Sequence, residues 1–268
     1  MRSKSPRAEL QQMLCIVSRG LTKKQTLLSR QVGKKMANEA FGGDRKLPMN
    51  SLLAKHERRL IDSNVHRFPD WVEGYHLTLT TLAWSIGLII FGWLARNNYH
   101  WLWGSSTMLF LQWFTDSFDG ALGRYRDTGI PKWGYYMDHF LDFVFMSSVL
   151  IGYSFLLNVS DRQLVYLLIP VCGCFMVSSY LAFGATNEFK ITYLGAGPTE
   201  MRIYFIVFNC LIISFGIAWV EKILIYILIV SIAVLCIVVY RTQKYIWNID
   251  MKEKRTREYD QESIAKEE

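Results

Sequence analysis

Acidic residues and glycines recur at helical spacing in one short part of this sequence, between residues 116 and 143. Four of the acids form two pairs, one spaced three residues apart and the other four. Because residues three, four or seven positions apart share one face of a helix, each pair predicts a stripe of carboxylates, with glycines in the same registers. A short connection would return the chain so that the two stripes face each other. The residues concerned are Asp116, Asp119, Gly120 and Gly123 in the first stripe, and Gly134, Asp138 and Asp142 in the second.

Such a group of carboxylates requires positive charge, since ionised groups in an apolar environment are costly unless they are paired. Clustered oxygen ligands suit a hard divalent cation, Mg²⁺ or Mn²⁺, better than zinc or copper. Glycines leave room for a bulky group near the backbone, and Arg124, directly after Gly123, offers a planar fork to a phosphate. The pattern therefore favours phosphoryl-group chemistry over the alternative that the aspartates only cap helix ends.

Long apolar runs surround these residues and predict an all-α integral membrane protein. The chain is 51% hydrophobic and has a mean hydropathy of +0.14, which exceeds the usual soluble composition. Roughly 20 apolar residues cross a bilayer core as a helix. We predict six transmembrane helices, at residues 77–95, 101–115 extended through the first stripe, 134–158, 164–185, 203–220 and 223–240.

The basic residues predict the orientation of these spans. All but three of the 30 Lys and Arg residues would lie on one side of the membrane, the exceptions being Arg96, Arg162 and Lys222. Positive charge stays on the cytoplasmic side, so we expect both termini and the aspartates to face the cytosol. The net charge of +7 then reflects topology and attraction to anionic lipid, and we expect no binding to a nucleic acid polymer.

The stretch before the first span is amphipathic, because Leu53, Leu60, Ile61 and Val65 share one helical face. We expect it to form a helix that lies on the membrane surface, with a solvated linker helix as the alternative. The chain therefore divides into a basic, disordered extension at residues 1–50, an amphipathic juxtamembrane helix at 51–74, a six-span domain at 75–242 and a charged tail at 243–268, which we expect to be disordered from residue 252.

The gapped acidic pattern resembles the signature of the CDP-alcohol phosphotransferase family, also called CDP-alcohol phosphatidyltransferases. One position differs, since Gly123 stands where the family usually has alanine. The segments "GYHLTLTTL", from Gly74, and "GAGPTEMR", from Gly195, also resemble family segments before the first and fifth spans. The pattern itself reads Asp116-x-x-Asp119-Gly120-x-x-Gly123-Arg124, nine residues, then Gly134-x-x-x-Asp138-x-x-x-Asp142.

This resemblance implies a metal-dependent enzyme of phospholipid synthesis. It implies transfer of a substituted phosphate from a CDP-alcohol to an acceptor alcohol, with release of CMP, by a homodimer that binds two Mg²⁺ or Mn²⁺ ions. One substrate would be a lipid, and the active site would face the cytoplasm, from the inner membrane if the source is bacterial. The implied roles are metal binding by Asp116, Asp119, Asp138 and Asp142, general base catalysis by Asp142, and nucleotide binding by Gly120, Gly123, Arg124 and Gly134.

Two donors remain possible at this point. CDP-diacylglycerol with a small acceptor alcohol is favoured by the six-span size, and CDP-choline or CDP-ethanolamine with a diacylglycerol-like acceptor is the alternative. Intramembrane prenyltransferases also use aspartates, but they need more spans and a second acidic motif far along the chain. A membrane transporter or scaffold would explain acids inside the membrane, but it would not explain the register of the glycines.

Overall fold

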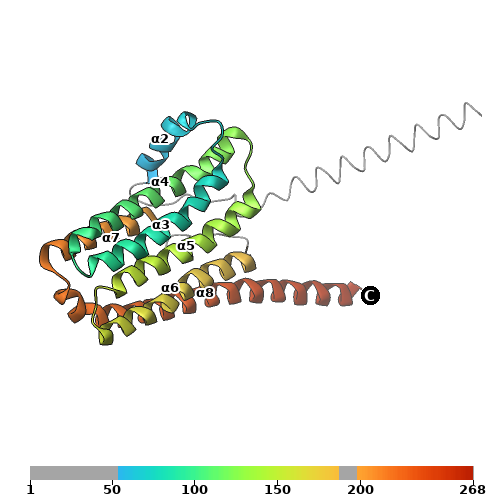
Figure 1. The fold of residues 1–268 in the computed structure, drawn as a ribbon. Coiled ribbons are helices and arrows are strands. Elements are labelled where there is room, and N and C mark those ends of the chain that lie inside the picture. Colours follow the sequence, from blue (N-terminus) through green and yellow to red (C-terminus); the bar gives the residue numbers. More distant parts are fainter. Residues whose placement is uncertain (1–53, 187–197, 268) are drawn as a thin grey trace, which may run out of the picture. The chain divides into compact units, whose positions relative to one another are not determined.

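The computed structural model describes residues 54–186 and 198–267, and all the regular structure within these ranges is helical (Figure 1). The predicted extension at residues 1–50 lies outside the described part. The elements are α2 (Ala54–Asn64), η2 (Val65–Arg67), α3 (Gly74–Ala95), η3 (Tyr99–Trp101), α4 (Leu102–Arg126), α5 (Pro131–Ser154), α6 (Val159–Thr186), α7 (Pro198–Phe215) and α8 (Ala218–Glu267).

Four of these helices are long and apolar enough to cross a membrane, namely α3, α6, α7 and α8. The chain is therefore a multi-pass membrane protein. The other two long helices, α4 and α5, coincide with the second and third predicted spans. Their 25 and 24 residues are enough to cross a bilayer core, but they also carry the acidic stripes. Six spans and cytosolic termini thus stay predictions.

Local backbone chemistry ends two of the helices. Helix α4 ends at Arg126 and is followed by Asp127, whose φ of 55° is left-handed. Pro131 then begins α5 at a position where its missing N–H is not needed. We predicted that the fifth span would run to residue 220. This was wrong, because Gly216 has a φ of 75° and ends α7 before α8 begins.

Helix α3 is the common packing partner of the two helices that carry the acids. It packs on α4 along one side and on α5 along another, and α7 then packs on α4 while α6 packs on α5 (Figure 1). The backbones of α3 and α5 come very close, because a Cβ added to Gly92 would lie only 2.5 Å from the Cα of Gly152. Small residues permit such close helix contacts in membranes. Helix α3 therefore sets the separation between α4 and α5.

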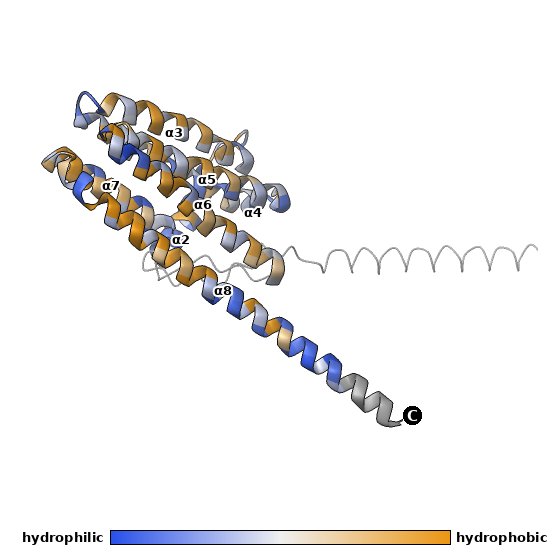
Figure 2. Ribbon diagram, turned by 90° about the horizontal axis from the view of Figure 1, so that it is seen from below, coloured by the Kyte–Doolittle hydropathy of each residue, from blue (hydrophilic) through white to orange (hydrophobic). Residues whose placement is uncertain are grey.

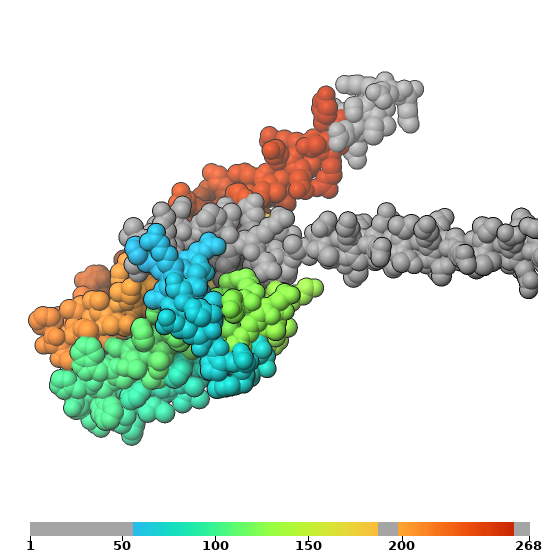
Figure 3. Space-filling view, turned by 90° about the horizontal axis from the view of Figure 1, so that it is seen from above, coloured from blue at the N-terminus to red at the C-terminus, as the bar shows by residue number. Residues whose placement is uncertain are grey.

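Helix α2 packs on the outside of α4 (Figure 3). Ile61 and Val65, two of the residues on its predicted apolar face, pack against Phe118 and Leu122 of α4. Among the described residues of this face, Leu60 has 43% of its surface exposed, and Leu53 lies outside the described residues. Much of the apolar face that we expected to rest on the membrane is thus covered by the protein itself.

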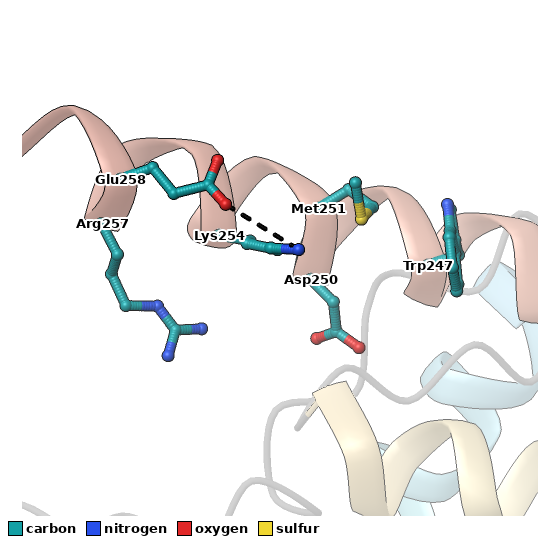
Figure 4. Close-up of a pocket in the computed structure, with 6 residues that line it drawn as sticks. All are labelled: Trp247, Asp250, Met251, Lys254, Arg257 and Glu258. Atoms are coloured by element: carbon teal, nitrogen blue, oxygen red, sulfur yellow. Dashed lines mark ion pairs between the residues drawn. The ribbon is translucent and has the colours of Figure 1, made fainter.

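Helix α8 continues through the region that we expected to be a disordered tail. Its 50 residues correspond to about 75 Å, far more than a bilayer core requires. Beyond its apolar stretch, the part of α8 that Figure 2 colours by hydropathy is mostly hydrophilic. Two ion pairs at i,i+4 spacing support this part, Lys254 with Glu258 at 3.8 Å and Arg257 with Glu253 at 3.9 Å. A shallow hollow there is lined, among the described residues, by α8 alone (Figure 4), so we assign it no site.

Candidate active site built on a carboxylate cluster

Three of the four predicted acidic ligands converge in the structure. Asp116 comes from α4, while Asp138 and Asp142 lie one turn apart on α5. Each offers one carboxylate oxygen, and these three oxygens lie within 4.8 Å of one another. Although α4 and α5 each pack on α3 far more than on each other, the three carboxylates meet between these two helices, and they remain partly exposed.

This arrangement fits a hard divalent cation. The three donors are all carboxylate oxygens, the ligand type that Mg²⁺ and Mn²⁺ prefer. Oxygens on opposite sides of a bound Mg²⁺ are roughly 4.2 Å apart, since each lies about 2.1 Å from the ion. The three oxygens of the cluster lie within 4.8 Å of one another, so side-chain rotations that draw them closer would bring them to coordinating distance.

Asp119, the fourth predicted ligand, is not one of these three. Its Oδ2 accepts a hydrogen bond of 2.6 Å from Thr78 Oγ1 on α3, and its Oδ1 accepts one from the backbone N–H of Gly120. Thr78 is 6% exposed, so this carboxylate is directed by a buried hydroxyl. Thr78 belongs to the "GYHLTLTTL" segment, but nothing in the spacing of that segment marks it as a partner of an aspartate.

A basic residue from a third helix completes the cluster. Arg202 of α7 is 8% exposed, and its Nη2 lies 2.8 Å from Asp116 Oδ2 and 3.9 Å from Asp142 Oδ1. Arg202 is far from the acidic stripes in the sequence, so its pairing with their aspartates cannot be predicted from residue spacing. The signal that the sequence offers is an arginine at the start of the fifth predicted span, and that position is equally consistent with a local ion pair to Glu200.

The predicted glycines have different surroundings. A Cβ added to Gly134 would meet none of the described residues within 4 Å, so with respect to them the face of α5 one turn before Asp138 is open. At Gly120 the added Cβ would lie 3.2 Å from Nη1 of Arg124, which places the Arg124 guanidinium beside this glycine. Open space thus adjoins Gly134, whereas Arg124 occupies the space beside Gly120. Nucleotide binding at these glycines stays a prediction.

Gly123 has a local structural reason to be small. A Cβ at this position would lie 3.2 Å from the Cα of Gly129, because the chain after α4 folds back against the helix end. The carbonyl of Gly123 also accepts a hydrogen bond from the backbone N–H of Thr128 at 3.1 Å. The close approach of the connection therefore accounts for Gly123 without any ligand.

Helix α2 contributes a residue that the sequence did not indicate. Glu57 accepts a hydrogen bond of 2.8 Å from Ser117, which follows Asp116 on α4, and another of 3.0 Å from Thr199 in the first turn of α7. This carboxylate therefore joins α2, α4 and α7 immediately beside the cluster. It holds the start of α7, and with it Arg202, close to Asp116.

Arg126, the last residue of α4, anchors the segment before α3. Its guanidinium donates hydrogen bonds to the carbonyls of Phe68 and Pro69, both at 2.9 Å, of Asp70 at 3.1 Å, and of Val72. This segment connects α2 to α3. Arg126 therefore fixes the elements that carry Glu57 and Thr78 relative to the end of α4.

Comparison with known proteins gives one positive result. A family model described as CDP-alcohol phosphatidyltransferase matches residues 77–242. The match covers more than half of the chain and contains both acidic stripes, Thr78 and Arg202. A search of curated proteins found no match.

Proposed function

The chain belongs to the CDP-alcohol phosphatidyltransferase family, and on that basis we propose that it transfers a substituted phosphate from a CDP-alcohol to an acceptor alcohol, releasing CMP. One observation supports this proposal above all. Carboxylate oxygens of Asp116, Asp138 and Asp142 lie within 4.8 Å of one another, beside the open face at Gly134. Oxygen donors next to unfilled space are what a metal-bound diphosphate requires.

Asp116, Asp138 and Asp142 would hold one divalent cation, Mg²⁺ or Mn²⁺. The second ion implied by the family resemblance would draw on Asp119, whose carboxylate is directed by Thr78. When bound, these cations neutralise the diphosphate and the charge that develops on the leaving CMP. Arg124, beside Gly120, would contact the phosphates, and Gly120 and Gly134 would leave room for the cytidine nucleotide.

Asp142 is the proposed general base. An alcohol is a weak nucleophile until its proton is removed, and a carboxylate within hydrogen-bond reach can remove it. The acceptor oxygen then forms a bond to the phosphorus that carries the donor's alcohol group. The bond from that phosphorus to the bridging oxygen of the diphosphate breaks, CMP leaves with the electron pair, and Asp142 retains the proton.

The membrane position suits substrates of opposite solubility. We propose that α4 and α5 also span the bilayer, which gives six spans with both termini and the carboxylates on the cytosolic side. There a lipid substrate and a water-soluble one can meet at the interface. In a bacterium this membrane would be the inner one. The homodimer implied by the resemblance also stays a prediction.

For the donor we propose CDP-diacylglycerol with a small acceptor alcohol, because a six-span chain matches the smaller branch of the family. Transfer from CDP-choline or CDP-ethanolamine to a diacylglycerol-like acceptor is the alternative. The carboxylate cluster could catalyse both reactions, because they share one chemical step and differ only in the donor and the acceptor.

The proposal is tested by CMP release from the purified protein in lipid–detergent micelles with Mg²⁺ or Mn²⁺. One series combines CDP-diacylglycerol with a panel of small alcohols, and the other combines CDP-choline or CDP-ethanolamine with diacylglycerol. Asp142→Asn should abolish release. Asp161→Asn removes a carboxylate of α6 that bonds only locally to Asn158 and should leave release intact. Folded, metal-supplied protein that releases no CMP from any pair would contradict the proposal and favour a transporter or scaffold.

A further inference from the structure

Arg202 places a positive charge where the proposed metal ion also has to bind. Its Nη2 is within hydrogen-bond distance of Asp116 Oδ2, at 2.8 Å, and 3.9 Å from Asp142 Oδ1. Both aspartates also belong to the group that could hold a cation. The guanidinium and the cation therefore draw on the same carboxylates.

Arg202 is held in this position and cannot simply swing into water. It is 8% exposed, and α7 is fixed on either side of it. One turn earlier, Thr199 donates a hydrogen bond to Glu57 at 3.0 Å. Two turns later, Asn209 donates one to Ser106 Oγ on α4 at 3.0 Å. The register of α7 on α4 thus keeps the guanidinium beside Asp116.

The charges set the direction of the effect. Three ionised carboxylates carry a formal charge of −3, and Arg202 reduces this to −2, which one divalent cation balances. A guanidinium and a divalent cation a few ångströms apart repel each other even with protein screening. A neutral side chain at position 202 would remove that repulsion and free one oxygen of Asp116 for the cation.

We propose that Arg202 is a built-in counter-charge that limits how tightly the carboxylate cluster binds its divalent cation. The inference rests on the proposed function, since it requires the cluster to bind a metal. Mg²⁺ is commonly held by a few carboxylates together with the substrate's phosphates. By weakening the protein's own hold on the cation, Arg202 leaves the diphosphate of the donor to supply the remaining negative charge. Arg202 is thus a positioning and affinity-setting residue, and not a ligand.

The first test is Mn²⁺ binding to the EDTA-treated, purified protein in micelles, measured by calorimetry without substrate. Arg202→Met should bind Mn²⁺ about tenfold more tightly than the wild type, whereas Arg202→Lys, which keeps the charge, should stay close to it. Arg162→Met is the matched control. Like Arg202, Arg162 donates hydrogen bonds, but its acceptors are the carbonyls of Ser154 at 3.0 Å and Leu157 at 3.2 Å. It has no part in the carboxylate cluster, so the Mn²⁺ affinity of this variant should equal that of the wild type.

Thermal unfolding supplies a second readout. In EDTA, Arg202→Met should unfold at a lower temperature than the wild type because its carboxylates lack a counter-charge. Added Mn²⁺ should raise that temperature more in Arg202→Met than in the wild type. In Arg162→Met, Mn²⁺ should raise the unfolding temperature by the same amount as in the wild type.

The outcomes separate this inference from the proposed function. Wild-type protein that binds Mn²⁺, together with Arg202→Met that binds it equally or more weakly, would overturn the inference and leave the metal site intact. If neither protein binds Mn²⁺, the metal part of the proposed function fails and the inference fails with it.

A further variant keeps the inference testable if Arg202→Met fails to fold. If Arg202→Met does not fold even with Mn²⁺, the double variant Arg202→Met with Asp116→Asn removes the carboxylate left without its partner. The inference predicts that this double variant folds. If it does not, the role of Arg202 is packing and not charge, and the inference is wrong.

Discussion

Two polar clusters join the same three helices, α4, α5 and α7, and they differ in charge and burial. The first contains Asp116, Asp142 and Arg202, which are charged and include partly exposed carboxylates. The second is centred on Asn209, which is 0% exposed. Its amide group donates to Ser106 Oγ at 3.0 Å, and its Oδ1 accepts from Tyr153 at 2.7 Å.

The difference shows which cluster requires something from outside the protein. The Asn209 cluster is neutral, and the Asn209 side chain has hydrogen-bond partners on both neighbouring helices. This cluster therefore requires no ligand to balance its charge or to satisfy the Asn209 amide. The carboxylate cluster keeps a formal charge of −2 even with Arg202, and it lies beside the open face at Gly134. An excess of charge next to open space is typical of a ligand site, whereas a satisfied neutral network is typical of helix packing.

Asp142→Asn should have the largest effect on activity and should spare stability. Loss of the proposed base should lower kcat by about 10²–10⁴-fold, while the unfolding temperature in EDTA should stay level or rise because like-charge repulsion is reduced. CMP release and thermal unfolding of the same preparation measure both. A variant that loses activity only in proportion to its loss of folded protein would place Asp142 in the same class as Asn209.

Thr78→Val should come next, because it removes the hydroxyl that directs Asp119. Loss of a residue that orients a metal ligand costs about 10–100-fold in activity or metal affinity. Thr80→Val is the matched control, since Thr80 bonds only to the carbonyl of Leu77 on its own helix. Equal activity of the two variants in the CMP assay would remove Asp119 from the functional cluster.

Gly134→Ala should raise the KM for the CDP-alcohol by about tenfold, because one methyl group in a fitted site has an effect of this order. The protein itself has room for the methyl group, so stability should be unchanged. Gly184→Ala on α6, where an added Cβ also meets nothing within 4 Å, should leave KM unchanged. An unaltered KM in Gly134→Ala would show that the nucleotide does not use this space.

Asn209→Leu should have the smallest effect on activity and the clearest effect on stability. It leaves Tyr153 and Ser106 without their buried partner, which costs about 1–3 kcal/mol. The unfolding temperature should fall, while CMP release per folded molecule should stay within about twofold of the wild type. A loss of specific activity comparable to that of Thr78→Val would mean that the two clusters do not act separately.

The sequence alone indicated the membrane class, the two acidic stripes and the family. These properties depend on composition and on spacing within a helix, and both can be read along the chain. The predicted boundaries of two elements were less accurate. The fifth span ends earlier because of Gly216, and α8 continues to Glu267 where a disordered tail was expected.

The hydrogen-bond and ion-pair partners of these acids could not be predicted from composition or spacing. Asp116 bonds to Arg202, Asp119 bonds to Thr78, and Glu57 joins Ser117 to Thr199. Each of these contacts links helices that are distant in the sequence, so it depends on the register of one helix against another. That register follows from close packing, such as the approach of α3 and α5 at Gly92 and Gly152. Residue types thus specify which groups could do the chemistry, and packing between helices specifies which charges they meet.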